Sequence, residues 1–94
     1  MNNNIHEILS ITIEEASEVI QSISKIFRFG IDTSWNGETN REHLEEEIGD
    51  LKAMIILLEE NGVIDPNKVN IAANTKIDKL KKWSNIFNPQ LDQY

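Results

Sequence analysis

Cysteine is absent from the 94 residues of this chain, so disulfides and thiolate chemistry are excluded and nothing points to an oxidising compartment. Basic residues are also scarce. Nine Lys and Arg stand against sixteen Asp and Glu, which gives a formal net charge of −7. A surface for nucleic acid or for an anionic membrane needs clustered positive charge, so the sequence predicts neither of these partners.

Long apolar runs are lacking as well. The longest purely apolar run, Ala53 to Leu58, is far shorter than the about 20 residues that span a bilayer. The first residues, Met1 to Asn4, lack the cationic stretch and apolar run of a signal peptide. At this length we expect one small soluble domain over residues 1–94, located in the cytoplasm.

Apolar side chains recur every three or four residues, which is the period of a helix rather than of a strand. We predict helices over 5–29, 40–61 and 66–84, a loop over 30–39, and no strand. The first helix should continue through Thr12–Glu15, although these residues have the form of a capping box. The second should begin at a capping box, Thr39–Glu42, and Gly62 sits where its C-cap should be. Asp65-Pro66 should begin the third helix. With an irregular tail after Phe87, the folded core covers about 5–84.

The predicted fold class is all-α: a small bundle of three main helices per chain, completed by self-association. Three helices bury little surface, and the second is apolar around much of its circumference through Ala53–Leu58. An isolated protomer would leave part of that surface exposed, so we expect a homo-oligomer, a dimer or a tetramer. Trp83 shares helical spacing with Leu80 and is expected in the core. The apolar stripe of the second helix is Leu44, Ile48, Leu51, Ile55 and Leu58.

Two of the predicted helices carry the same acidic pattern, E-E-x-x-[E/D], at Glu14–Glu18 and at Glu46–Asp50. At about 100° per residue, Glu15 and Glu18 lie on one shoulder of the first helix's apolar face. Glu47 and Asp50 lie on the equivalent shoulder of the second. If the helices pack antiparallel with these shoulders facing each other, the four carboxylates meet at one cleft.

Four carboxylates in a partly desolvated cleft repel one another, and a hard divalent cation, Mg²⁺ or Mn²⁺, removes the repulsion. Mg²⁺ keeps waters and binds substrate phosphates, so the cluster points to a phosphorylated substrate. The alternative is that these Glu-rich shoulders are solvated surface. Gly49 costs its helix ~1 kcal/mol relative to Ala. Close approach of a helix or ligand would explain it, and a neutral accident remains open.

The two acidic motifs, in this order, resemble the MazG-like branch of the all-α nucleoside triphosphate pyrophosphohydrolases. Further matching stretches are Lys25–Gly30, Glu47–Leu51 and, in the third helix, Asn74-x-Lys76 followed by Lys79-Leu80-x-Lys82. The likeness spans about residues 8–83 and fits short stand-alone members, including phage-encoded ones. It implies Mg²⁺-dependent hydrolysis of an NTP or dNTP to the monophosphate and pyrophosphate, in an oligomeric bundle.

The same resemblance implies roles for individual acids. Glu15, Glu18, Glu47 and Asp50 match the metal ligands, with Mg²⁺ as the cofactor and Mn²⁺ as a substitute. Glu14 would be an outer-shell acid or the catalytic base that orients the attacking water, and Glu46 is expected to be only solvated.

Five residues are expected to bind substrate. Lys76 and Lys79 resemble the phosphate-contacting positions, and Asn74 and Lys82 are grouped with them. Lys82 stands where many relatives carry Arg, so it would offer a point charge rather than a bidentate fork. The alternative for the lysines is a solubilising helix surface. Trp35, in a loop of small and polar residues, either stacks on a nucleobase or packs against a neighbouring subunit.

Neither histidine has partners at zinc spacing. His43 lies one turn before Glu47, where an outer-shell role competes with a plain surface position. Two alternatives to the nucleotide hydrolase stay open. One is a non-catalytic acidic helical protein that binds a partner or acts as a nucleic-acid-mimicking inhibitor. The other is a sister enzyme that acts on phosphoribosyl-ATP or dUTP.

Overall fold

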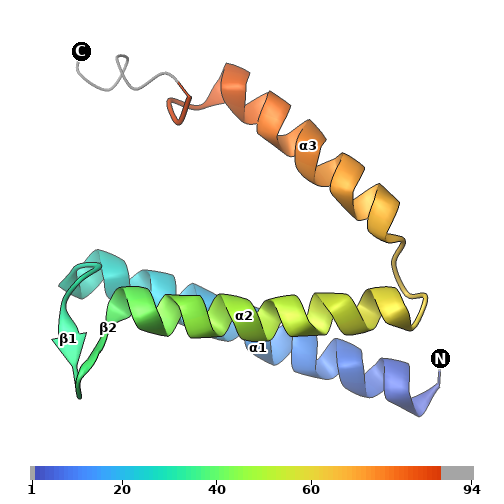
Figure 1. Cartoon of the computed structure of the whole chain (residues 1–94), viewed down its shortest axis with the longest axis horizontal. Helices are drawn as coiled ribbons and strands as arrows, with labels where there is room; N and C mark the ends of the chain where they lie inside the picture. The colour runs from blue at the N-terminus through green and yellow to red at the C-terminus, as the bar shows by residue number, and fades with distance from the viewer. Residues whose placement is uncertain (1, 88–94) are drawn as a thin grey trace. The chain divides into compact units, whose positions relative to one another are not determined.

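A computed structural model describes residues 2–87 of the chain, so the irregular tail expected after Phe87 lies outside the described residues. Three helices account for most of it: α1 (Asn3–Phe29), α2 (Asn40–Glu60) and α3 (Pro66–Trp83). Between α1 and α2 lies a hairpin of two short strands, β1 (Ser34–Trp35) and β2 (Glu38–Thr39) (Figure 1). The predicted all-α class is confirmed, and each predicted helix is present.

The helix starts follow local capping chemistry. The capping box predicted for α2 is formed: Thr39 Oγ1 accepts the Glu42 N–H at 3.1 Å, and Glu42 Oε1 accepts the Thr39 N–H at 3.0 Å. Asp65 caps α3 by accepting the Asn67 N–H at 2.9 Å, with Pro66 at the first helical position. These side chains satisfy amides that the first turn of a helix leaves without partners.

α1 runs unbroken through the stretch that has the form of an internal capping box. The Thr12 hydroxyl donates to the Ile8 carbonyl at 2.7 Å, within the helix, instead of capping a new one. The prediction of one continuous first helix is therefore confirmed. Asn2 caps the start of this helix, since its side chain accepts the Ile5 N–H at 2.8 Å.

α2 ends at Glu60, with Asn61 at the C-cap and Gly62, the terminating glycine that the sequence indicated, directly after it. Gly62 has a φ of 71°, in the left-handed region that favours glycine. Its N–H donates to the Glu59 carbonyl at 3.1 Å, and the Val63 N–H donates to the Leu58 carbonyl at 2.9 Å. These two hydrogen bonds form a Schellman motif, which satisfies carbonyls of the last turn.

The loop predicted over 30–39 contains a strand pair, so the prediction of no strand was wrong there. The turn residues Asn36 and Gly37 both have positive φ, 53° and 80°, as a type I′ hairpin turn requires. The strands are antiparallel and pair Ser34 with Thr39 and Trp35 with Glu38. Two-residue strands are too short to show the alternation by which strands are found in a sequence.

The segment before the hairpin is tied to the start of α2. Arg41 holds Asp32 with two hydrogen bonds, Nε to Oδ1 at 2.9 Å and Nη2 to Oδ2 at 3.2 Å. The Asn40 side chain donates to the Gly30 carbonyl at 2.8 Å, and the Arg41 N–H donates to the Ile31 carbonyl at 2.8 Å. These bonds fix the start of α2 close to the end of α1.

α1 and α2 lie side by side and run in opposite directions (Figure 1). Met54 and Leu58 are buried along α2, and so is Glu47, whereas Ile48 of the predicted stripe is 48% exposed. The buried face of α2 is thus turned from Ile48 toward Glu47. This corrects the sequence prediction, because Glu47 lies within the buried face rather than on its shoulder.

The chain divides into two compact units, residues 1–63 and 64–94. The described part of the second unit contains α3, which has no buried residue. Trp83 is 83% exposed. Its expected core position was wrong for the single chain, since the described part of its unit, residues 64–87, contains no second helix to cover it. No helix within residues 2–87 has the length and apolar character to cross a membrane.

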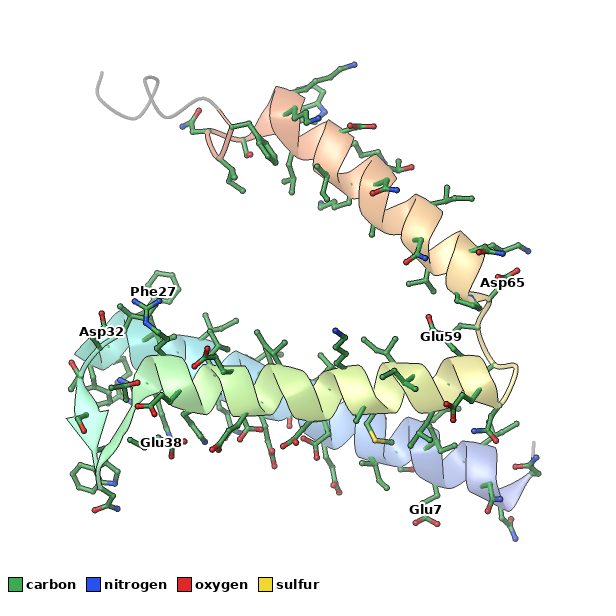
Figure 2. The ribbon with its side chains drawn as sticks, in the orientation of Figure 1. Glu7, Phe27, Asp32, Glu38, Glu59 and Asp65 are labelled. Atoms are coloured by element: carbon green, nitrogen blue, oxygen red, sulfur yellow. The ribbon has the colours of Figure 1, made fainter. Side chains whose placement is uncertain are left out.

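Several large apolar side chains of the first unit remain uncovered. Ile13, Ile20 and Phe27 lie at seven-residue intervals on α1, and Phe27 projects away from its helix in Figure 2. Their exposed fractions are 72%, 65% and 86%. Self-association through these faces stays a prediction.

Candidate metal centre

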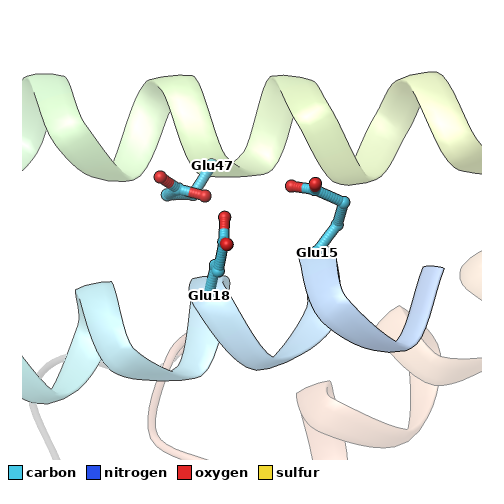
Figure 3. Close-up of side chains that lie close together, drawn as sticks. All are labelled: Glu15, Glu18 and Glu47. Atoms are coloured by element: carbon cyan, nitrogen blue, oxygen red, sulfur yellow. The ribbon is translucent and has the colours of Figure 1, made fainter. Parts of the chain in front are cut away.

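Three carboxylates converge between α1 and α2. Glu15 and Glu18 reach across from α1 and Glu47 reaches back from α2 (Figure 3). One carboxylate oxygen of each residue lies within 4.8 Å of those of the other two. The antiparallel packing anticipated from the two acidic motifs brings these side chains together. An all-oxygen donor set of this kind suits a hard divalent cation.

Two oxygens of this cluster lack the partners that buried polar atoms normally have. Glu15 Oε2 and Glu47 Oε2 are buried and accept no hydrogen bond from the described part of the chain. Glu47 as a whole is only 9% exposed. A buried carboxylate oxygen without a partner is costly, and a proton or a cation relieves that cost. The cluster therefore fits a metal ion better than it fits an apolar interface.

Electrostatics within the cluster point the same way. Desolvation is the largest effect that raises the pKa of Glu15, and the nearby charges of Glu18, Asp50 and Glu14 raise it further. The largest effect that raises the pKa of Glu47 is a hydrogen bond to Glu18, followed by desolvation. Without a cation the folded chain resists full ionisation of this cluster.

The fourth expected ligand, Asp50, is exposed and lies outside the group of three converging carboxylates. Its charge nevertheless contributes to the raised pKa of both Glu15 and Glu47. Glu14 is exposed on α1. Glu46 is exposed too, and the neighbouring Glu38 carboxyl of the hairpin raises its pKa.

Glu47 of the cluster also contacts a histidine, which in turn contacts a serine. His43 Nε2 lies 3.2 Å from Glu47 Oε1, and His43 Nδ1 lies 3.2 Å from Ser22 Oγ. His43 thus contacts Glu47, as the outer-shell alternative requires, and its role toward a metal stays a prediction. Ser22 was missed, although it continues the line of Glu15 and Glu18 along α1, and that spacing was the available signal.

A cavity of about 580 Å³ lies between the hairpin and the adjoining ends of α1 and α2. Trp35, predicted to bind substrate, lines it together with Phe29 and Lys25. His43 also lines it, so the cavity borders the residue that contacts Glu47. Its complete lining is Lys25, Phe29, Thr33, Ser34, Trp35, Glu38, Thr39, Asn40 and His43.

The remaining expected substrate residues belong to the other unit. Asn74, Lys76, Lys79 and Lys82 all occupy exposed positions on α3. The three carboxylates and the cavity belong to the first unit.

Comparison with known proteins agrees with the resemblance seen in the motifs. The model of the MazG nucleotide pyrophosphohydrolase domain matches residues 3–84. This chain therefore belongs to the MazG nucleotide pyrophosphohydrolase family. No curated protein and no solved structure matches it. The family supports a hydrolase that acts on nucleotides, and hydrolases of this family typically use a divalent metal.

Proposed function

We propose that this chain is a Mg²⁺-dependent nucleoside triphosphate pyrophosphohydrolase that converts an NTP or dNTP and water to the monophosphate and pyrophosphate. The observation that carries the proposal is the group of three carboxylates with two buried, unpartnered oxygens in a chain of the MazG family. Glu15, Glu18 and Glu47 would hold the ion. We propose Asp50 as a fourth ligand and Mn²⁺ as a substitute for Mg²⁺.

A divalent cation bound there would lower the pKa of a bound water and neutralise charge on the leaving pyrophosphate. The exposed Glu14 carboxylate, next to Glu15 in the chain, is proposed to orient the attacking water and accept its proton. The bond that breaks joins the α-phosphorus to the bridging oxygen of the α–β phosphoanhydride.

The cavity is proposed to hold the nucleoside. Its volume of about 580 Å³ falls within the ordinary range for small-molecule sites. Trp35 and Phe29 offer aromatic surface on which a base can stack, and Trp35 is 76% exposed in the single chain. His43 borders both the cavity and Glu47, which would put the nucleoside next to the reacting phosphates.

The α3 residues are proposed as further substrate contacts, and this part rests on the family motif. Lys76 and Lys79 would offset phosphate charge, with Asn74 and Lys82 beside them. We also propose that the enzyme works in the cytoplasm as a homo-oligomer. A non-catalytic acidic mimic is less well supported, because a mimic needs its charges on the surface and Glu47 is buried.

A substrate screen tests the function and separates the sister activities. The purified chain is incubated with each NTP and dNTP, dUTP included, and with phosphoribosyl-ATP, in Mg²⁺ or in excess EDTA. We expect pyrophosphate and the matching monophosphate in equal amounts, and in Mg²⁺ only. No turnover of any compound in Mg²⁺ or Mn²⁺, or release of orthophosphate alone, would contradict the proposal.

A further inference from the structure

Ser22 is polar but occupies one of the most buried positions of the helix pair. It is 1% exposed, less than the apolar Met54 at 8% and Leu58 at 7%. A hydroxyl at such a position needs a hydrogen-bond partner to offset the loss of water. Its partner is the imidazole of His43, with Oγ and Nδ1 separated by 3.2 Å and the two residues 21 positions apart in the chain.

The partners of the two ring nitrogens assign the direction of each hydrogen bond. Nε2 faces Glu47 Oε1 at 3.2 Å. When Glu47 is ionised, as a ligand of a cation must be, this oxygen can only accept, so Nε2 carries the hydrogen and donates. In the neutral ring Nδ1 is then the acceptor, and the Ser22 hydroxyl donates to it. The result is a directed chain from Ser22 through His43 to Glu47.

We propose that Ser22 and His43 are positioning residues that hold the Glu47 carboxylate ready for the cation, an inference that rests on the metal centre of the proposed function. His43 engages Oε1 of Glu47 and leaves Oε2, which is buried and unpartnered. Glu47 thus has one oxygen fixed by the protein and one available as a ligand. Residues that hydrogen-bond a metal ligand fix its orientation, and their loss weakens metal binding.

The positions of His43 and Ser22 on the two helices support these positioning roles. His43 and Glu47 lie one turn apart on α2, and Ser22 lies on α1. The contacts from Ser22 through His43 to Glu47 therefore also link the two helices that supply the carboxylates. Ser22 approaches only the histidine in the hydrogen bonds of the described chain, so its removal should act on Glu47 through His43 alone.

The test measures Mn²⁺ binding to the full chain without nucleotide, by the loss of the free-ion signal in electron paramagnetic resonance. We expect Ser22→Ala to weaken binding about tenfold and His43→Asn about 10–100-fold, the range for residues that support metal ligands. His43→Gln should bind more tightly than His43→Asn, because the longer amide can still donate near the position of Nε2. Ser24→Ala, at an exposed position of the same helix, is the matched control and should bind as the unsubstituted chain does.

A second readout follows the ring itself. In ¹⁵N-edited spectra, the unsubstituted chain should show His43 with its hydrogen on Nε2. Ser22→Ala should shift the Nδ1 resonance while circular dichroism shows the helices intact. Normal Mn²⁺ affinity in Ser22→Ala and in His43→Asn, together with weak binding in Glu18→Gln, would overturn the positioning roles and leave the metal centre standing. Failure of the unsubstituted chain to bind Mn²⁺ would overturn both.

Discussion

Glu47 is subject to two opposing demands at the interface of α1 and α2. The neighbouring Glu18 and, after it, burial favour its protonated form and raise its pKa, whereas His43 favours the charged form. Desolvation raises the pKa of Glu15 beside it. Ionisation of carboxyl groups with raised pKa lowers the stability of the folded chain, unless a cation compensates the charge.

The sign of the pH dependence follows from these shifts. Because the folded-state pKa of both Glu15 and Glu47 is raised above the ordinary value of 4.5, their stabilising effect is complete below that value. It is lost as the pH rises through the raised pKa. In EDTA, we therefore expect the free energy of unfolding to fall from acidic toward neutral pH, and Mg²⁺ to restore it at neutral pH.

Glu47→Gln isolates this effect, since the amide removes the charge and keeps the shape. At neutral pH without metal, we expect this variant to be at least as stable as the unsubstituted chain, to depend less on pH, and to gain little from Mg²⁺. Denaturant unfolding over a pH series measures this, with Glu45→Gln, at an exposed position of the same helix, as the control. A stability of the metal-free chain that rises with pH over this window would contradict the account.

At the residue scale, the sequence indicated three acids that converge in the structure, but not their surroundings. Glu15, Glu18 and Glu47 follow from helical spacing, which is local. The pairing of Ser22 with His43 depends on how far each helix is rotated about its axis and on the axial register between them. The burial of Glu47 and the exposure of Ile48 show that the buried face of α2 is rotated from the one inferred from apolar spacing.

Helix ends are the features of the elements that the sequence indicates best, because capping is local chemistry. Thr39 with Glu42, Asp65 with Pro66, and Gly62 all act as their positions predict. The hairpin was missed because it depends on the turn formed by Asn36-Gly37 rather than on a periodic pattern. Gly49 stays without a structural explanation within the chain, since a Cβ there would meet nothing within 4 Å.

For α3, the prediction concerns the contact of Lys76 with substrate phosphate. If this lysine contacts phosphate, Lys76→Ala should lower kcat/KM by ~10–1000-fold, the effect of losing one charged contact to a developing negative charge. Lys68→Ala, at an exposed position near the start of the same helix, removes the same charge and is the control. Steady-state kinetics of both variants decide the matter. Equal losses would mean that only the overall charge of α3 matters.

At the scale of the whole molecule, the uncovered apolar side chains of α1 are the basis for self-association. Sedimentation velocity should show an oligomer for the unsubstituted chain and a smaller species for Ile20→Lys, which places a charge in the proposed interface. Ile71→Lys is the matched control, because Ile71 on α3 is exposed to the same 65% as Ile20. A stable monomer of the unsubstituted chain at micromolar concentration would contradict this prediction.

The net charge of −7 also bears on substrate binding, because a triphosphate is strongly anionic and is repelled by an acidic protein. Under the proposed function, the carboxylate cluster would therefore carry a cation before the substrate binds well. Substrate affinity should rise steeply with Mg²⁺ concentration, and the adjacent acids Glu46 and Glu47 should differ sharply in their importance.

The most direct test compares Glu47→Gln with Glu46→Gln in pyrophosphate release from the preferred triphosphate across a Mg²⁺ titration. Both changes remove one negative charge from neighbouring positions, but Glu47 belongs to the buried cluster and Glu46 is exposed. We predict that Glu47→Gln loses more than about 100-fold in turnover even at saturating Mg²⁺, whereas Glu46→Gln changes turnover little. Near-normal turnover in Glu47→Gln, or an equal or larger loss in Glu46→Gln, would contradict the metal centre between α1 and α2.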